Sequence, residues 1–264
     1  MRWARAVVMA AVVAVFFWPR AVGAEQDKTD HKFGKFTRTE AQFLIGDRFK
    51  LGSNAPDTNA RGTITINHFT KFDDGDLFFF IDFARELDGG KKNSIYGEVY
   101  AALDVSKLFD DQSAQRSWNL SAIAGMNLGN TSGAFLPGVR LNLKVPGFDL
   151  FSLYALAYET FRDGRDRDLK TTYQGTFVWN MPLIKDGDVK LLGFSGFLDV
   201  RGGRDDSQSG TIITQPQLRL DIGHILFDRP NKYHLGTELS IIRNKFNVEG
   251  VHEFAPQLLF VVQL

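Results

Sequence analysis

Two tyrosines and a glutamate occupy every second position between residues 96 and 100. Successive side chains of an extended strand point to opposite faces, so Tyr96, Glu98 and Tyr100 share one face. Tyrosine supplies a flat aromatic surface and a hydroxyl group, and a carboxylate accepts hydrogen bonds. Together these groups can stack on a planar ring and bind the polar groups beside it. The opposite face of the same segment is apolar and comprises Ile95, Val99, Ala101, Leu103 and Val105.

Amides and charges recur at the same spacing in later segments. Gln217, Arg219 and Asp221 alternate with apolar residues, and Glu238 lies on the polar face of segment 232–244. The candidate site residues on these inferred faces are Tyr96, Glu98, Tyr100, Arg140, Gln217, Arg219, Asp221 and Glu238. An alternative is that the four charged members after residue 100 only pair with one another, because buried charges need partners.

The elements that would carry these residues are β-strands. Runs rich in β-branched and aromatic residues are separated by Asp/Gly turns, which is the pattern of hairpins. Twelve such segments are expected: 41–50, 62–71, 76–86, 94–106, 117–127, 133–144, 148–161, 168–181, 188–201, 210–223, 232–244 and 256–264. Most are about ten residues long, which is the length a tilted strand needs to cross a bilayer. The predicted fold is all-β, a single antiparallel transmembrane β-barrel of about 12 strands.

The connections between the segments support this interpretation. Bacterial barrels have short turns at the end that carries the termini and longer loops at the other end. The turns at 73–75, 145–147 and 185–187 are short, whereas several alternate connections are longer and charged. The long connection 108–117 departs from the pattern.

The N-terminus predicts export. Arg2 and Arg5 precede an apolar run of about a dozen residues, and small residues follow around Ala24, as in a cleavable signal peptide. The run is shorter than the roughly 20 residues of a membrane-spanning helix. We therefore expect a signal peptide at 1–24, a polar leader at 25–40, and an outer-membrane barrel at 41–264.

Composition excludes several functional classes. There is no cysteine, so disulfide frameworks and thiolate metal sites are ruled out. Cleavage after Ala24 would reduce the 31 basic residues by three against 31 acidic ones, a slightly acidic balance unsuited to phosphate backbones. We expect no nucleic-acid partner, no metal and no cofactor.

Several aromatic residues are harder to place. Phe78, Phe79 and Phe80 are adjacent, so they must point to both faces, and we expect most of them to pack against the bilayer. Tyr154 and Tyr158 lie in a segment that is apolar on both faces in places, so the sequence leaves their orientation open.

The order of these segments resembles the nucleoside-specific channel-forming outer-membrane proteins, the Tsx-like porins. The resemblance lies in D-D-G-D-L-F-F-F-I-D-F, I-Y-G-E-V-Y-A-A-L-D-V-S-K-L, Y-E-T-F-R-D-G, G-F-S-G-F-L-D-V-R-G-G-R-D-D-S and V-E-G-V-H-E-F-A-P-Q-L. It implies a monomeric twelve-stranded barrel in the bacterial outer membrane, in contact with lipid, that passes nucleosides by diffusion. Tyr96, Glu98 and Tyr100 stand at the matching strand. The sequence departs from the usual aromatic end of such barrels by finishing in Leu264.

Three other functions are compatible with the same pattern. The barrel could be non-conducting and serve as a surface adhesin or structural protein, or the chain could be a soluble periplasmic β-protein. A barrel lipid hydrolase would need a serine beside a histidine. His234 and Ser240 share a face of one segment, but six residues of extended chain separate them by roughly 20 Å.

Overall fold

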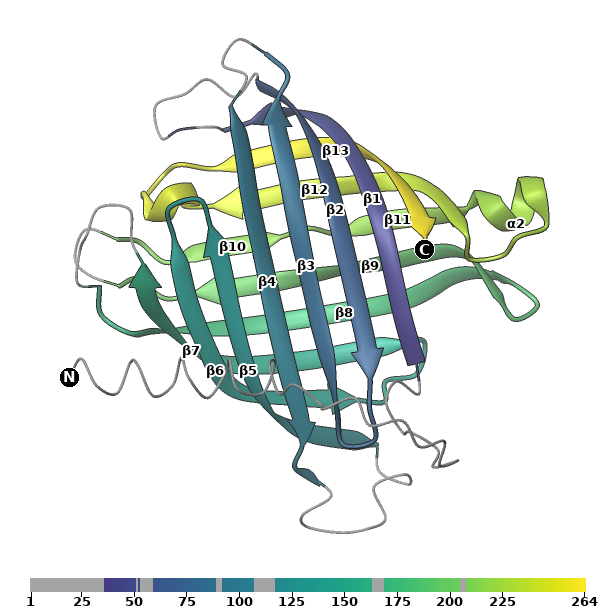
Figure 1. Cartoon of the computed structure of the whole chain (residues 1–264), viewed down its shortest axis with the longest axis horizontal. Coiled ribbons are helices and arrows are strands. Elements are labelled where there is room, and N and C mark those ends of the chain that lie inside the picture. The colour runs from purple at the N-terminus through teal and green to yellow at the C-terminus, as the bar shows by residue number, and fades with distance from the viewer. Residues whose placement is uncertain are drawn as a thin grey trace, which may run out of the picture. The chain divides into compact units, whose positions relative to one another are not determined.

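Long antiparallel strands form one sheet that closes on itself (Figure 1). The computed structural model describes residues 36–50, 52, 59–88, 92–106, 117–162, 169–204 and 208–264. The predicted signal peptide, most of the predicted leader and most of connection 108–117 lie outside these residues. Within the described residues, no helix is long and apolar enough to cross a membrane.

Thirteen strands are assigned within the described residues, and most have eleven residues or more. They are β1 (Phe36–Phe49), β2 (Asn59–Lys71), β3 (Gly75–Glu86), β4 (Asn93–Asp104), β5 (Trp118–Gly129), β6 (Gly133–Leu143), β7 (Leu150–Arg162), β8 (Thr172–Asp186), β9 (Val189–Arg201), β10 (Thr211–Thr214), β11 (Gln217–Asp221), β12 (Tyr233–Arg243) and β13 (Glu253–Gln263). Two short helices, α2 (Ile222–Phe227) and the 3-10 helix η3 (Lys245–Asn247), lie in the connections.

The sheet has no free edge. From β1 to β9 each strand pairs with its sequence neighbours, and β13 pairs with both β12 and β1. Strands β10 and β11 both pair with β9 on one side and β12 on the other, so they are two halves of one barrel strand. The break falls at Gln215 and Pro216, where proline has no N–H for the ladder. The predicted twelve-strand antiparallel barrel is thereby confirmed.

Exposure distinguishes the two faces of the wall. On β4, Ile95 and Leu103 are 53% and 57% exposed, whereas Tyr100 and Ala102 are each 8% exposed. The apolar set therefore faces outward and the polar set faces the lumen, as the sequence predicts for a membrane barrel. In the last strand Phe254 and Leu258 are exposed in the same way.

Aromatic side chains gather on the outer face near both ends of the barrel. Toward the end that carries the termini, Trp179 stacks on Phe177 with ring centroids 5.1 Å apart and contacts Phe194 at 5.7 Å. Toward the opposite end, the rings of Phe135 and Phe161 lie 4.6 Å apart. Aromatic rings on the outer face of a barrel favour the headgroup region of a membrane.

Three predictions about the elements need correction. The first strand begins at Phe36, five residues before the predicted start, and it continues the ladder with β2 down to Lys71. The segment predicted as a strand at 210–223 is broken at Pro216 and ends in helix α2. Phe78 and Phe80 face the lumen because they pair with Tyr100 and Glu98, so only the middle phenylalanine of the three faces outward.

Close approach of two strands requires glycine at position 138. A Cβ atom there would lie 2.1 Å from the carbonyl oxygen of Ala155 and 2.9 Å from Cα of Leu156. We predict that Gly138→Ala destabilises the barrel by about 1–3 kcal/mol, since overpacking forces a backbone shift. Gly175→Ala is the matched control, because a Cβ there has nothing within 4 Å. Urea unfolding in detergent measures both, and equal stability of the two variants would contradict the prediction.

Candidate functional site

The face of β4 that points into the lumen carries a tyrosine–glutamate cluster, defined as Tyr96, Glu98 and Tyr100. Glu98 accepts hydrogen bonds from both phenol groups: Oε1 from Tyr96 and Oε2 from Tyr100, the latter at 2.9 Å. Strand β5 leaves room for the second ring, because a Cβ at Gly125 would lie 2.5 Å from Cε1 of Tyr100. Phe80 on β3 packs against Tyr96 with ring centroids 6.0 Å apart. The cluster therefore has a fixed carboxylate held between aromatic rings.

A second group on the lumen face consists of Tyr158 on β7, Arg201 on β9 and Arg204 just after β9. The guanidinium carbon of Arg201 lies 4.7 Å from the ring centroid of Tyr158, and that of Arg204 lies 5.7 Å from it. Asn127 donates from Nδ2 to the Tyr158 hydroxyl at 3.3 Å, and it pairs in register with Glu98 across the β4–β5 ladder. This contact connects the two aromatic groups around the lumen. The region combines flat rings, guanidinium groups, an amide and a carboxylate.

A glutamine–glutamate network crosses the seam where the barrel closes. Its members are Glu40, Gln42, Gln217, Arg219, Glu238 and Gln257. Glu238 accepts from Gln257 at 2.7 Å and from Gln217, and Gln217 also donates to Gln42 at 3.1 Å. Arg219 donates to Glu40 at 3.0 Å. The network joins β11, β12, β13 and β1 across the interior, so it ties the last strands to the first.

Arg140 forms a bidentate ion pair with Asp76. Its two terminal nitrogens donate to the two carboxylate oxygens at 2.8 and 2.5 Å, and the side chains are 8% and 12% exposed. The Tyr154 ring lies 5.9 Å from the guanidinium carbon and meets Tyr100 edge-on at 6.3 Å. Both tyrosines that the sequence left open, Tyr154 and Tyr158, thus face the lumen.

All eight sequence-predicted residues lie on the lumen face, but they form separate groups. Tyr96, Glu98 and Tyr100 come together, and Gln217, Arg219 and Glu238 come together. Arg140 is linked to the first group through Tyr154, and Asp221 lies apart from both. Asp221 is fully buried and caps α2, with its carboxylate accepting from the backbone N–H of His224 and of Asn231. The predicted pairing of charges occurs, but the partners are Glu40 and Asp76 and not other members of the set.

Sequence reasoning missed several lumen residues. Asp76, Tyr158, Arg201 and Glu40 belong to the groups described above. Asp199 also faces the lumen and accepts a hydrogen bond from Thr176 at 2.5 Å. Asp199 and Arg201 alternate in the last residues of their strand, so the spacing-of-two rule could have selected them. Nothing in the sequence could have paired Arg140 with Asp76, which stands 64 residues earlier.

Some lumen-facing side chains are closely packed. Leu136 and Leu259 are 0% exposed and Val261 is 1% exposed, although all three point inward. Within the described ranges, no group of three or more His, Asp or Glu residues could hold a metal ion. The interior is thus lined by neutral and charged hydrogen-bonding groups and by rings.

One histidine contacts hydroxyl groups of the β1–β2 ladder. His68 contacts the hydroxyl oxygens of Thr39 and Thr70 through its two ring nitrogens, both at 2.7 Å. No carboxylate orients this histidine among the bonds of the described residues, and the neighbouring strand amides are used in the β1–β2 ladder.

Comparison with protein-family models gives a match over residues 49–260. The chain belongs to the family described as "Domain of unknown function (DUF5020)". That description names no substrate for the DUF5020 domain, so the nucleoside specificity stays a prediction. A comparison with curated protein sequences finds no match.

Solved structures similar to the DUF5020 domain are outer-membrane barrels. A KdgM porin matches with a TM-score of 0.50 and 10% identity, covering 87% of this chain and 99% of the porin. The COG4313 outer membrane channel from Pseudomonas putida F1 matches at 0.47 and 11%, covering 91% and 100%. Outer membrane phospholipase A from Escherichia coli matches at 0.45 and 8%, covering 90% and 94%. At such identities the likeness shows the fold alone, that of an outer-membrane β-barrel.

The Arg140–Asp76 pair gives a test of how the interior is stabilised. We predict that Asp76→Asn destabilises the barrel by about 3–5 kcal/mol, because it leaves a buried guanidinium without its counter-charge. The double variant Asp76→Leu, Arg140→Met should regain most of this stability. Asp149→Asn is the control, since its partner Lys190 is 26% exposed and such pairs contribute at most about 1 kcal/mol. Urea unfolding in detergent measures the differences, and a loss no larger than that of the control would refute the prediction.

Proposed function

We propose that this barrel is a narrow channel through which small hydrophilic solutes, chiefly nucleosides, diffuse across the outer membrane. The observation that carries the proposal is the tyrosine–glutamate cluster facing the lumen, with Tyr158 and Arg201 on the wall beyond it. A nucleoside has a flat base and a polyhydroxylated ribose. Aromatic rings next to a carboxylate, an amide and guanidinium groups are complementary to both parts.

The chemistry of the cluster assigns a role to each kind of side chain. The tyrosine rings stack on the base of the nucleoside. Every base can be bound in this way, because every base has a π-face. Glu98 and Asn127 now make hydrogen bonds with tyrosine hydroxyls. When a nucleoside binds, they replace these bonds with hydrogen bonds to its ribose hydroxyls or to the edge of its base. Arg201 keeps its cation–π contact with Tyr158.

Conduction requires that this binding be weak. A solute must enter the site and leave it at the other end, so each contact exchanges one hydrogen bond for another of similar strength. The hydrogen bonds within the cluster provide such an exchange, because the empty site is already satisfied. No energy coupling is involved, and the concentration gradient alone drives transport.

A second candidate function is a non-conducting barrel with a structural or adhesive role. The observation that favours it is the filled interior, in which Leu136, Leu259 and Val261 are essentially unexposed although they face inward. A barrel whose side chains close the lumen at every level would pass neither ions nor solutes.

Single-channel recording and liposome swelling separate these functions. We predict discrete conductance steps in a planar bilayer and faster entry of nucleosides than of neutral or acidic sugars of similar size, because only the nucleoside stacks on the rings. A complete lack of conductance would favour the non-conducting barrel. Conductance with equal entry rates for all solutes would leave a general porin and remove the nucleoside specificity.

Substitution of Tyr158 tests the stacking role. We predict that Tyr158→Leu weakens nucleoside block of the ion current at least 5-fold, since stacking on an aromatic ring contributes about 1–3 kcal/mol per base. Tyr158→Phe should keep most of the block because it retains the ring. Tyr173→Leu is the matched control, because Tyr173 is 62% exposed on the outer face. Equal block in the Leu and Phe variants at position 158 would show that stacking there is not used.

A further inference from the structure

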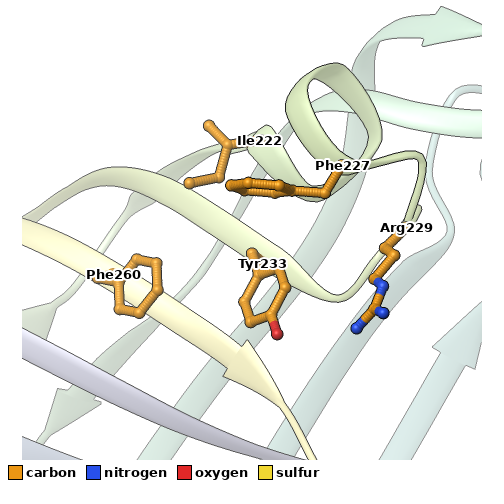
Figure 2. Close-up of a pocket in the computed structure, with 5 residues that line it drawn as sticks. All are labelled: Ile222, Phe227, Arg229, Tyr233 and Phe260. Atoms are coloured by element: carbon orange, nitrogen blue, oxygen red, sulfur yellow. The ribbon is translucent and has the colours of Figure 1, made fainter.

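A pocket of about 510 Å³ lies on the outside of the barrel wall, beneath helix α2. Figure 2 shows its lining: Ile222, Phe227, Arg229, Tyr233 and Phe260. Four of the five side chains are apolar or aromatic, and the volume lies in the range of roughly 300–1,000 Å³ typical of small-molecule pockets. We call this feature the α2 groove.

The groove opens on the membrane-facing surface. Tyr233 on β12 and Phe260 on β13 alternate with His234 and Val261, which point into the lumen, so the two aromatic residues point outward. Leu235 and Leu258, which are 42% and 55% exposed, continue the same outer surface along the two strands. The apolar floor of the groove is thus continuous with the surface that contacts lipid chains.

Helix α2 is held rigidly above this floor. Its first residue follows Asp221, whose buried carboxylate accepts from the backbone N–H groups of His224 and Asn231 at both ends of the turn. His224 Nε2 also contacts Asp186 at the tip of the β8–β9 hairpin at 2.8 Å. Figure 1 places the helix at the barrel end where the C-terminus lies. The turn is therefore a fixed structural feature beside the membrane interface.

The helix exposes apolar residues where a soluble turn would expose polar ones. Ile225, Leu226 and Phe227 are 51%, 64% and 56% exposed in succession. Three neighbouring apolar side chains on a short interfacial helix are stabilised by insertion among acyl chains, as in amphipathic helices that lie in the membrane plane. The helix and the wall together form two apolar sides of one groove.

A single positive charge stands at the rim. Arg229 is exposed, and its guanidinium group has no hydrogen-bond or ion-pair partner among the described residues. In Figure 2 the guanidinium group and the Tyr233 hydroxyl lie on the same side of the apolar side chains. Asp228, the nearest acidic residue in the chain, is the C-cap of α2 and is not part of the lining. A guanidinium fork matches the oxygens of a phosphate, and tyrosine hydroxyls favour the headgroup region.

We propose that the α2 groove binds one glycerophospholipid of the leaflet at the terminal end of the barrel. An acyl chain occupies the space between Phe227 and Phe260, and the phosphate contacts Arg229, with Tyr233 beside it. The combination of an apolar cavity that opens to the bilayer and an unpaired guanidinium at its rim fits a phospholipid. A soluble anion would leave the apolar cavity unfilled, and a neutral lipid would leave the Arg229 guanidinium unpaired. The site is independent of conduction through the lumen.

Native mass spectrometry of the detergent-solubilised protein tests the proposal, with dioleoylphosphatidylglycerol as the probe. We expect one lipid to be retained by the wild type at concentrations where further lipids dissociate. Arg229→Gln should lower its apparent affinity at least 5-fold, and Phe227→Ala should lower it as well. The matched control is Arg85→Gln, which removes the same charge from an exposed position near the opposite end of the outer face. Heat-dependent mobility on a denaturing gel verifies that each variant is folded.

Two competitors identify the part of the lipid that is recognised. Glycerol-1-phosphate, which has the headgroup chemistry without chains, should not displace the lipid, and dioleoylglycerol, which has the chains without phosphate, should bind at least 5-fold more weakly. The proposal is overturned if the wild type retains no lipid, if Arg85→Gln loses as much affinity as Arg229→Gln, or if either competitor binds as well as the phospholipid.

Discussion

The requirement that every backbone N–H and C=O group be paired inside a bilayer determines this structure. Lipid chains offer no hydrogen bonds, so a sheet in the membrane is stable only if it closes. Closure occurs where β13 pairs with β1, which brings the two ends of the described chain together: Leu264 N–H donates to the Thr39 carbonyl at 2.9 Å. The same requirement explains why Pro216 falls at a break between two half-strands and not inside a continuous one.

Closure also produces the chemistry of the interior. Once the strands form a ring, half of each strand's side chains point into a confined space where charges need partners. The ion pairs and amide bonds that result come from strands far apart in sequence, such as Glu40 with Arg219. Groups satisfied in this way can exchange their partners with a passing solute, which links the stability of the barrel to the proposed transport of nucleosides.

The connection that contains α2 shows how the outer face is completed. Most turns at that end are brief, but this one folds into a capped helix that covers part of the wall and exposes Leu226 and Phe227. The Asp221 carboxylate accepts hydrogen bonds from backbone N–H groups of this turn. It is therefore not available to bind a solute in the lumen. A residue that lies on the lumen face therefore holds the turn at the end of the barrel.

The sequence by itself determined the architecture. Alternation with a period of two and strands of bilayer-crossing length gave twelve strands, the outward face of Ile95 and Leu103, and the inward face of Tyr96, Glu98 and Tyr100, because these features depend only on local backbone geometry. Only the tertiary structure decided which side chains meet. The pairing of Arg140 with Asp76, the contact of Arg201 with Tyr158 and the groove between Phe227 and Phe260 join residues from different strands. Their proximity follows from the curvature and register of the closed sheet, which no local pattern records.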